Sequence, residues 1–164
     1  MDTVATGCTA DSVELHCSAL HEKDKFKNKW QKFRIVKDGD DYRLEADEAF
    51  NAGTDYDNGY RMAGSLITEG GASILPTQES TDVDYGAYLY LNDFSGRDIT
   101  GLPVLKKVTP DNILLPDVEQ KEQIGVHSYA LSQRIEVVDM RYFRFSPRNR
   151  MRKIGCLIQR LTGR

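Results

Sequence analysis

The densest group of side chains that could do chemistry lies at the C-terminal end of the chain. Residues 140–164 contain eight arginines and lysines and no acidic residue. Ser146 followed by Pro147 has the form of a helix N-cap with proline at the first helical position, and Gly163 lies where such a helix would end. We therefore predict a helix over residues 147–162, about 24 Å long. Its basic residues predicted to contact a polyanion are Arg148, Arg150, Arg152, Lys153 and Arg160.

The position of the arginines within this helix argues for an external partner. The first three lie at the N-terminal end, where the backbone dipole is already positive, so local helix stability does not explain them. Nucleic-acid phosphates, anionic lipid head groups or the protein's own acidic region would each supply the missing counter-charge. The alternative is a helix that packs on its own domain while the arginines stay solvated. The apolar stripe that would form the interface in either case consists of Met151, Ile154, Leu157, Ile158 and Leu161.

A second basic segment spans residues 23–37, with seven basic residues against one aspartate. Aromatic residues are interleaved with the lysines, and this combination suits single-stranded nucleic acid, which offers phosphates to cations and bases to aromatic rings. We predict polyanion contact for Lys25, Lys27 and Lys29. Trp30, the only tryptophan, is expected to anchor the core and not to stack on bases.

Metal and catalytic signatures are weak. Cys17 and His21 would share one face of a strand but lie about 13 Å apart, and zinc-finger spacing is absent from the sequence. The motifs of phosphate-binding loops, nucleophile elbows and zinc proteases are absent too. Cys156 is the one thiol with a chemical rationale, because basic residues lie within a helical turn of it. We expect no catalytic residue, no metal and no cofactor.

Charge is segregated along the chain although the net charge is only -3. Residues 1–22 carry -4, residues 23–37 carry +6, residues 38–139 carry -13 and residues 140–164 carry +8. Such segregation points to a polyanion partner or to self-association between an acidic body and a basic arm.

Length and composition indicate one folded domain. The chain has 164 residues, 40% of them hydrophobic, which excludes a disordered protein. Apolar runs fall short of the roughly 20 residues that a membrane span needs. Three irregularly spaced cysteines do not form a disulfide framework, so we expect an intracellular protein, cytoplasmic or nuclear.

Most of the chain shows the alternation of apolar and polar residues that is typical of strands. In residues 13–19 the pattern predicts that Cys17 faces inward and His16 outward. A second strand, residues 83–92, has leucines on one face and Tyr88 and Tyr90 on the other. Residues 49–59 are expected to form an exposed loop, and residues 117–132 are compatible with either a short helix or a loop. Residues 135–145 are predicted to form a long strand with a bulge or a sharp twist at Val137 and Val138.

Residues 31–47 form the clearest hairpin. Two registers keep its apolar faces together, but a two-residue turn at residues 38–39 would place two arginines opposite each other. A four-residue turn over residues 38–41 instead pairs residues of opposite charge. The predicted pairs are Ile35 with Leu44, Arg34 with Glu45, and Lys32 with Asp47.

Together these patterns predict a mainly β (α+β) fold, an antiparallel sandwich or partly open barrel of about seven or eight strands with a C-terminal amphipathic α-helix. The β domain would span residues 1–145, and the helix, residues 146–164, would belong to it or protrude as an arm. The predicted function is non-enzymatic binding and assembly, with RNA or DNA preferred as the polyanion. One alternative is a module that binds a membrane surface or a partner protein through the helix. Another is an enzyme with an acidic cleft near Asp84 and Tyr88.

Overall fold

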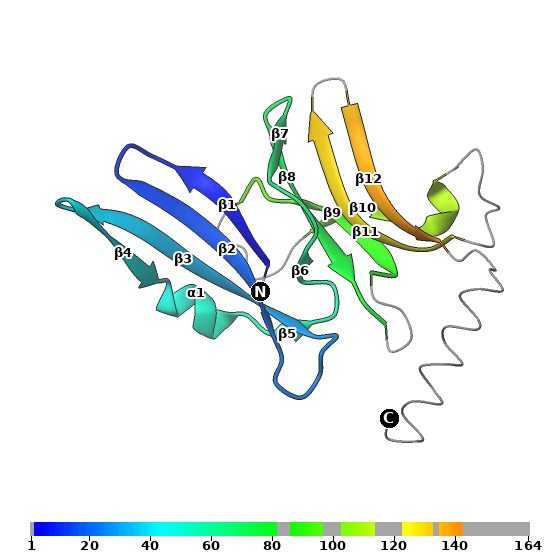
Figure 1. Ribbon diagram of the computed structural model, residues 1–164, viewed down its shortest axis with the longest axis horizontal. Helices are drawn as coiled ribbons and strands as arrows, with labels where there is room; N and C mark the ends of the chain where they lie inside the picture. The colour runs from blue at the N-terminus through cyan, green and yellow to red at the C-terminus, as the bar shows by residue number, and fades with distance from the viewer. Residues whose placement is uncertain (1, 82–85, 97–102, 114–122, 133–134, 143–164) are drawn as a thin grey trace, which may run out of the picture.

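The computed structural model describes residues 2–81, 86–96, 103–113, 123–132 and 135–142. Regular structure in these residues is mainly antiparallel strand, as the sequence predicts, and the strands are arranged in three layers (Figure 1). The described strands number twelve, more than the seven or eight expected, and their sheets form no closed barrel. The predicted C-terminal helix lies outside the described residues.

The first layer is a five-stranded sheet with the order β1-β2-β3-β4, in which β5 pairs with the beginning of β3. A bulge between Ala5 and Gly7 interrupts the pairing of the first two strands. The strands are β1 (Asp2–Cys8), β2 (Ser12–Leu20), β3 (Asn28–Asp38), β4 (Asp41–Ala46) and β5 (Tyr56–Asp57).

The β3–β4 hairpin confirms the predicted register. Arg34 pairs with Glu45 and Ile35 with Leu44, and the strands extend to the pair formed by Asp38 and Asp41. Gly39 has a φ of +66°, which suits a tight turn that only glycine adopts without strain. The register that pairs opposite charges, and avoids two arginines facing each other, is therefore the one that the structure shows.

The prediction of an exposed loop over residues 49–59 is wrong in its first half. Helix α1 (Glu48–Gly53) begins after Asp47, whose side chain accepts a hydrogen bond from the N–H of Phe50. Asn51 fixes the helix to β3, because its amide accepts from the N–H of Lys32 at 2.6 Å and donates to the carbonyl of the same residue at 3.2 Å. Asp47 is therefore the N-cap of α1. The prediction missed it because the residues that follow are types common in turns.

The second layer is a sheet with the order β10-β9-β8-β6, with β7 paired to β8. Side chains of this sheet face both neighbouring layers: Leu75 packs toward the first sheet, and Leu89 packs toward the third layer. Both faces of this sheet are therefore covered. Its elements are β6 (Arg61–Met62), β7 (Ile67–Glu69), β8 (Ala72–Glu79), β9 (Tyr88–Asp93), β10 (Val104–Val108) and the 3-10 turn η1 (Pro110–Asn112).

The third layer is the hairpin of β11 (Gln123–Ser132) and β12 (Ile135–Tyr142). The sequence allowed a helix or a loop for the first of these segments, and the structure shows a strand instead. The irregularities lie between Gln123 and Gly125 and between Val126 and Ser128 of β11, not at the predicted Val137, which pairs regularly. Each irregularity leaves one extra residue in β11, which is the mark of a β-bulge.

Main-chain contacts dock this hairpin onto the central layer. The N–H of Val126 donates to the carbonyl of Gly86, and the N–H of Tyr129 to that of Ala63, both at 2.8 Å. A Cβ on Gly125 would lie 2.4 Å from the Gly86 carbonyl oxygen. The approach is therefore so close that position 125 requires glycine.

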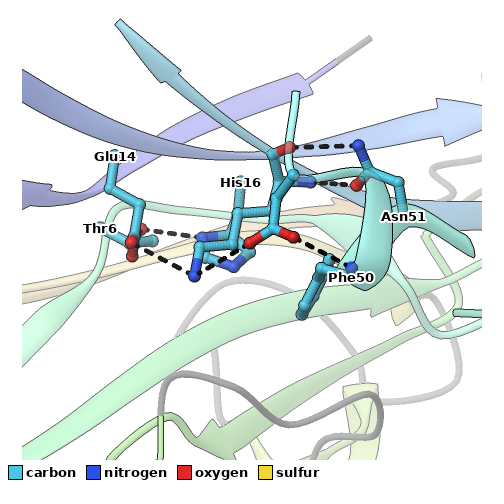
Figure 2. Close-up of polar contacts among 7 residues, drawn as sticks. Thr6, Glu14, His16, Phe50 and Asn51 are labelled. Atoms are coloured by element: carbon cyan, nitrogen blue, oxygen red, sulfur yellow. Dashed lines mark hydrogen bonds and ion pairs between the residues drawn. The ribbon is translucent and has the colours of Figure 1, made fainter. Parts of the chain in front are cut away.

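A polar cluster occupies the inner face of the first sheet (Figure 2). His16 has no exposed surface, so the prediction that it faces outward is wrong. Its Nδ1 lies 2.8 Å from the hydroxyl of Thr6, and its ring contacts those of Trp30, Phe50 and Phe94. The neighbouring Lys32 ammonium forms ion pairs with Glu14 at 3.3 Å and with Asp47, as predicted, at 3.7 Å.

The outer face of the first sheet is apolar and open. Phe33 and Ile35 are half-buried there, and Leu44 and Tyr42 are 63% and 72% exposed. Apolar and polar residues therefore alternate in this hairpin as predicted, but the polar face of the hairpin is the one that faces the core.

Candidate functional site

A cavity of about 630 Å³ opens where β5 and the turn after it meet the polar face of β8 and β9. Three tyrosines line it together with acidic and amide side chains and one lysine. The tyrosines are Tyr56, Tyr60 and Tyr90, and the polar residues include Asp57, Asn58, Glu79, Asn92 and Lys27.

Local sequence explains how each wall is built. β5 pairs with β3 so that Tyr56 lies opposite Lys29. The carboxylate of Asp57 then accepts a hydrogen bond from the N–H of Gly59 at 2.7 Å, which closes the turn. On the other wall, the alternation of β9 turns Tyr90 toward the cavity and Leu89 into the opposite core, as the sequence predicts.

The tyrosine rings are held in different ways. Tyr56 is 42% exposed and packs edge-to-face on His21, with ring centroids 4.6 Å apart. Tyr60 packs against Trp30 with centroids 5.6 Å apart. The hydroxyl of Tyr90 donates to Glu79. Tyr56 thus offers an accessible ring surface, and the other two form the fixed wall.

Burial and nearby acids keep the inner phenols neutral. Burial, the hydrogen bond to Glu79 and the surrounding negative charge raise the pKa of Tyr90 well above its usual value of about 10. Burial and the charges of Asp57 and Asp55 also raise the pKa of Tyr60. Both hydroxyls therefore remain protonated near neutral pH.

Two side-chain oxygens in the lining accept no hydrogen bond from the described residues. Asp57 uses Oδ1 for Gly59, and no described residue donates to its Oδ2. Asn58 Oδ1 is buried and accepts no hydrogen bond from the described part of the chain. Asp57 is exposed, so its carboxylate is accessible, whereas the buried Asn58 Oδ1 is an exception to the rule that buried acceptors are satisfied.

Lysines from distant segments reach the tyrosines. Lys27, from the basic segment of residues 23–37, lines the cavity itself. Lys107 places its ammonium 3.7 Å from the ring centroid of Tyr88 and 5.3 Å from that of Tyr90, and it lies 3.8 Å from Glu79. Along the chain these tyrosines belong to the acidic region, but in space they are flanked by cations.

The other predicted contact residues occupy separate positions. Lys25 is exposed, with its ammonium 5.1 Å from the ring centroid of Phe26, and Lys29 is half-buried beside Tyr56 in the strand register. Trp30 is 2% exposed, which confirms that it is a core residue. The structure therefore brings Lys27 to the cavity and pairs Lys29 with one of the lining tyrosines, Tyr56. Several predicted residues lie outside the described part of the chain: Arg148, Arg150, Arg152, Lys153, Arg160, the apolar stripe residues, Cys156 and Asp84.

Sequence reasoning missed the contribution of residues 55–60 to the site. The segment was expected to be a solvated turn, and its two tyrosines were given no role. A signal was present, because Tyr56 and Tyr60 flank a turn in which Asp57, Asn58 and Gly59 favour hydrogen bonding to the backbone. Such a turn can present aromatic rings on both sides.

The buried thiol of Cys17 accepts a hydrogen bond from the Thr3 hydroxyl at 3.4 Å, whereas Cys8 is exposed. Within the described ranges, histidines, cysteines and acids form no group of three that could hold a metal ion. Of the helices that the structure describes, none has the length and apolar character to cross a membrane. Comparison with known proteins found no matching family model, no similar curated protein and no similar solved structure.

Proposed function

We propose that the chain is a non-enzymatic protein that binds single-stranded nucleic acid. The observation that carries the proposal is the presence of Lys27 in the same cavity as Tyr56, Tyr60 and Tyr90. Proteins that bind single strands combine cations that track the phosphates with aromatic rings on which bases stack. The accessible ring of Tyr56 and the half-buried Lys29 opposite it provide both elements within two paired strands.

The size and polarity of the cavity support a nucleotide as its occupant. Ligand sites commonly have volumes of roughly 300 to 1,000 Å³, and this cavity measures about 630 Å³. Its aromatic surface matches the face of a base, and its polar side chains can bond to a base edge. A double helix uses its base faces in stacking, so the proposal is specific to single strands.

The basic C-terminal segment would extend this contact along the phosphate backbone. Its eight basic residues without an acid supply the charge that the acidic β domain lacks. The same segment can pair with the acidic domain of a second copy, so we propose assembly of several copies on one strand. Head-to-tail contacts of this kind generate rings or filaments.

Salt-dependent binding tests the proposal. The full chain is titrated into a fluorescent single-stranded RNA or DNA at several salt concentrations, beside the duplex and heparin. Each phosphate contact contributes about 0.7 to the slope of log K against log salt for single strands. Replacing Lys25, Lys27 and Lys29 by glutamine should lower the slope by about 2. Glutamine at the five predicted contact residues of the C-terminal segment, Arg148, Arg150, Arg152, Lys153 and Arg160, should lower it by about 3.5.

The controls separate nucleic acid from other anionic partners. The control variant carries Lys37→Gln and Lys106→Gln, two exposed positions that do not line the cavity. Its salt slope of binding should stay near that of the wild type. Salt-insensitive or undetectable binding to every nucleic acid would refute the proposal. Flotation with anionic liposomes, abolished by the C-terminal substitutions, would instead favour the membrane-surface alternative.

A further inference from the structure

We infer that two copies of the chain pair through strand β4, an inference that goes beyond the proposed function and does not depend on nucleic acid. β4 lies at one end of the first sheet, and β3 is its only partner among the described strands (Figure 1). An unpaired strand edge presents a row of main-chain donors and acceptors to which a strand of another molecule can pair. The sequence of β4 fits a second β4 as that partner.

Every second residue of β4 turns its main-chain N–H and carbonyl toward the open edge. The N–H of Asp47, directly after the strand, donates to the carbonyl of Lys32 in β3. Main-chain groups of an antiparallel strand point to the same side at every second residue, so the odd-numbered residues of β4 bond to β3 and the even-numbered ones point away. No described residue bonds to these outward main-chain groups. They belong to Tyr42, Leu44 and Ala46.

The charges of β4 select one register for a two-fold pair of strands. When the pair is centred on Leu44, this leucine lies opposite its own copy and Arg43 lies opposite the partner's Glu45, once on each side of the axis. Tyr42 then faces the partner's Ala46, so the apolar side chains meet on the outer face of the sheet. The side chains of Arg43 and Glu45 are 60% and 40% exposed, so a second copy can reach them.

The other registers are unfavourable. Those that set an odd-numbered residue opposite an even-numbered one would turn the polar side of one strand onto the apolar side of the other. Centred on Arg43, the pair would place that arginine opposite its copy and Asp41 opposite the partner's Glu45, and centred on Glu45 it would place two glutamates together. The same rule of charge pairing holds for the register that β3 and β4 adopt within the chain.

The contact also covers exposed apolar surface. Leu44 and Tyr42 are 63% and 72% exposed, and both would lie beside apolar side chains of the second copy. At the ends of the pair, Asp41 would come opposite the partner's Asp47. The charge of Asp47 is already compensated, because the Lys32 ammonium lies 3.7 Å from its carboxylate.

Cysteine crosslinking of the full chain locates the contact. In a background with Cys8 and Cys156 replaced by serine and the buried Cys17 left in place, Leu44→Cys puts two thiols at the two-fold axis. Paired Cα atoms there lie about 5.5 Å apart, within the range of a disulfide. Tyr42→Cys is the matched control, because its two copies would lie about 14 Å apart. Oxidation at about 100 µM protein, near the expected dissociation constant, should crosslink most of the first variant and little of the second.

Sedimentation equilibrium from about 1 µM to 1 mM measures the dimer, which should be weak because a single strand edge buries little surface. Arg43→Glu creates two like-charge contacts in the dimer and should weaken it about tenfold. Lys37→Glu makes the same charge change at an exposed position of β3 and should leave the dimer within about twofold of the wild type. Adding Glu45→Arg to Arg43→Glu restores opposite charges and should bring the dissociation constant back to within about threefold. Melting temperatures check the fold, since position 45 faces Arg34 of its own chain.

The outcomes separate this contact from other forms of association. A chain that stays monomeric up to 1 mM overturns the inference, whether solvent or its own C-terminal segment covers the edge. Equal crosslinking of the two cysteine variants, or no recovery when the charges are exchanged, places the association elsewhere and overturns it too. Glutamine at the basic residues of the C-terminal segment should leave the Leu44→Cys crosslink intact, and its loss would contradict a contact through β4. Failure of nucleic-acid binding would refute the proposed function and leave this dimer in place.

Discussion

Replacing Lys32 by methionine would test how the polar cluster stabilises the first sheet. The residue is 8% exposed, and its ammonium lies 3.3 Å from Glu14 and 3.7 Å from Asp47. Methionine retains the apolar stem but removes the charge, so the two carboxylates lose the cation that compensates them. Lys32 is held in place by its own main-chain hydrogen bonds to Asn51, which the substitution leaves intact.

The expected loss of free energy of unfolding depends on how exposed the carboxylates of Glu14 and Asp47 are to water. Breaking a fully buried ion pair costs roughly 3 to 5 kcal/mol in free energy of unfolding, because a charge is left uncompensated. The side chains of Glu14 and Asp47 are 22% and 39% exposed, so water will solvate them in part. We therefore expect a loss of about 2 kcal/mol, below the range for a fully buried pair.

Urea unfolding followed by Trp30 fluorescence measures this loss. With a slope of about 2 kcal/mol per molar urea, the midpoint should fall by about 1 M. Arg43→Met is the matched control, because its ion pair with Glu45 is short, 2.6 Å, but 60% and 40% exposed, and it should cost less than about 0.5 kcal/mol. Equal losses in the two variants, or a gain of stability in Lys32→Met, would refute the reasoning.

Three further outcomes are expected from the packing of the layers. Gly125→Ala should lower the free energy of unfolding by about 1 to 3 kcal/mol, since its Cβ would lie 2.4 Å from a main-chain oxygen; melting temperature and proteolysis of the β11–β12 hairpin check this. Burial and a hydrogen bond to a glutamate raise the pKa of Tyr129 to about 12. Because this tyrosine ionises at a lower pH, about 10, in the unfolded chain, the free energy of unfolding should fall as the pH rises from about 10 to 12. Tyr129→Phe should flatten that decline, which urea midpoints measured across this pH range will show. Leu75→Ala should cost about 2 to 5 kcal/mol because Leu75 has no exposed surface, whereas Leu44→Ala, at 63% exposure, should cost well under 1 kcal/mol in the same assay.

Sequence reasoning succeeded where the decisive interaction is local. The register of the β3–β4 hairpin depends on residues that face each other across one turn, and the pair of Arg34 and Glu45 was sufficient to choose it. The faces of β9 follow from alternation alone, and Tyr90 and Leu89 lie on the predicted sides. Both features are encoded within a few residues of the chain.

Orientation toward the core could not be predicted in the same way. The inner face of the first sheet holds His16 and Lys32 in a buried polar network beside the apolar Trp30, while the apolar Leu44 faces solvent. Alternation shows that a strand has two different faces, but it does not show which face another layer will cover. The assumption that the apolar face is the inner one placed His16 on the wrong side.

The candidate site depends on contacts between distant segments. Lys27 and Tyr90 line one cavity because β5 bridges back to β3 and the two sheets pack together, and Lys107 reaches Tyr88 through the pairing of β9 and β10. A count of charge along the chain assigned these tyrosines to an acidic region. Only the fold shows that cations lie beside them.

Affinity for a single-stranded oligonucleotide in a pair of tyrosine variants tests the central claim most directly. Tyr56→Ala removes the 42% exposed ring of the cavity, and Tyr42→Ala removes a 72% exposed ring on the outer face of the first sheet. Loss of one stacked base costs about 1 to 3 kcal/mol, so Tyr56→Ala should weaken binding about 5- to 150-fold with an unchanged salt slope, while Tyr42→Ala should bind as the wild type does. Equal affinities of the two variants would contradict binding at the tyrosine cavity.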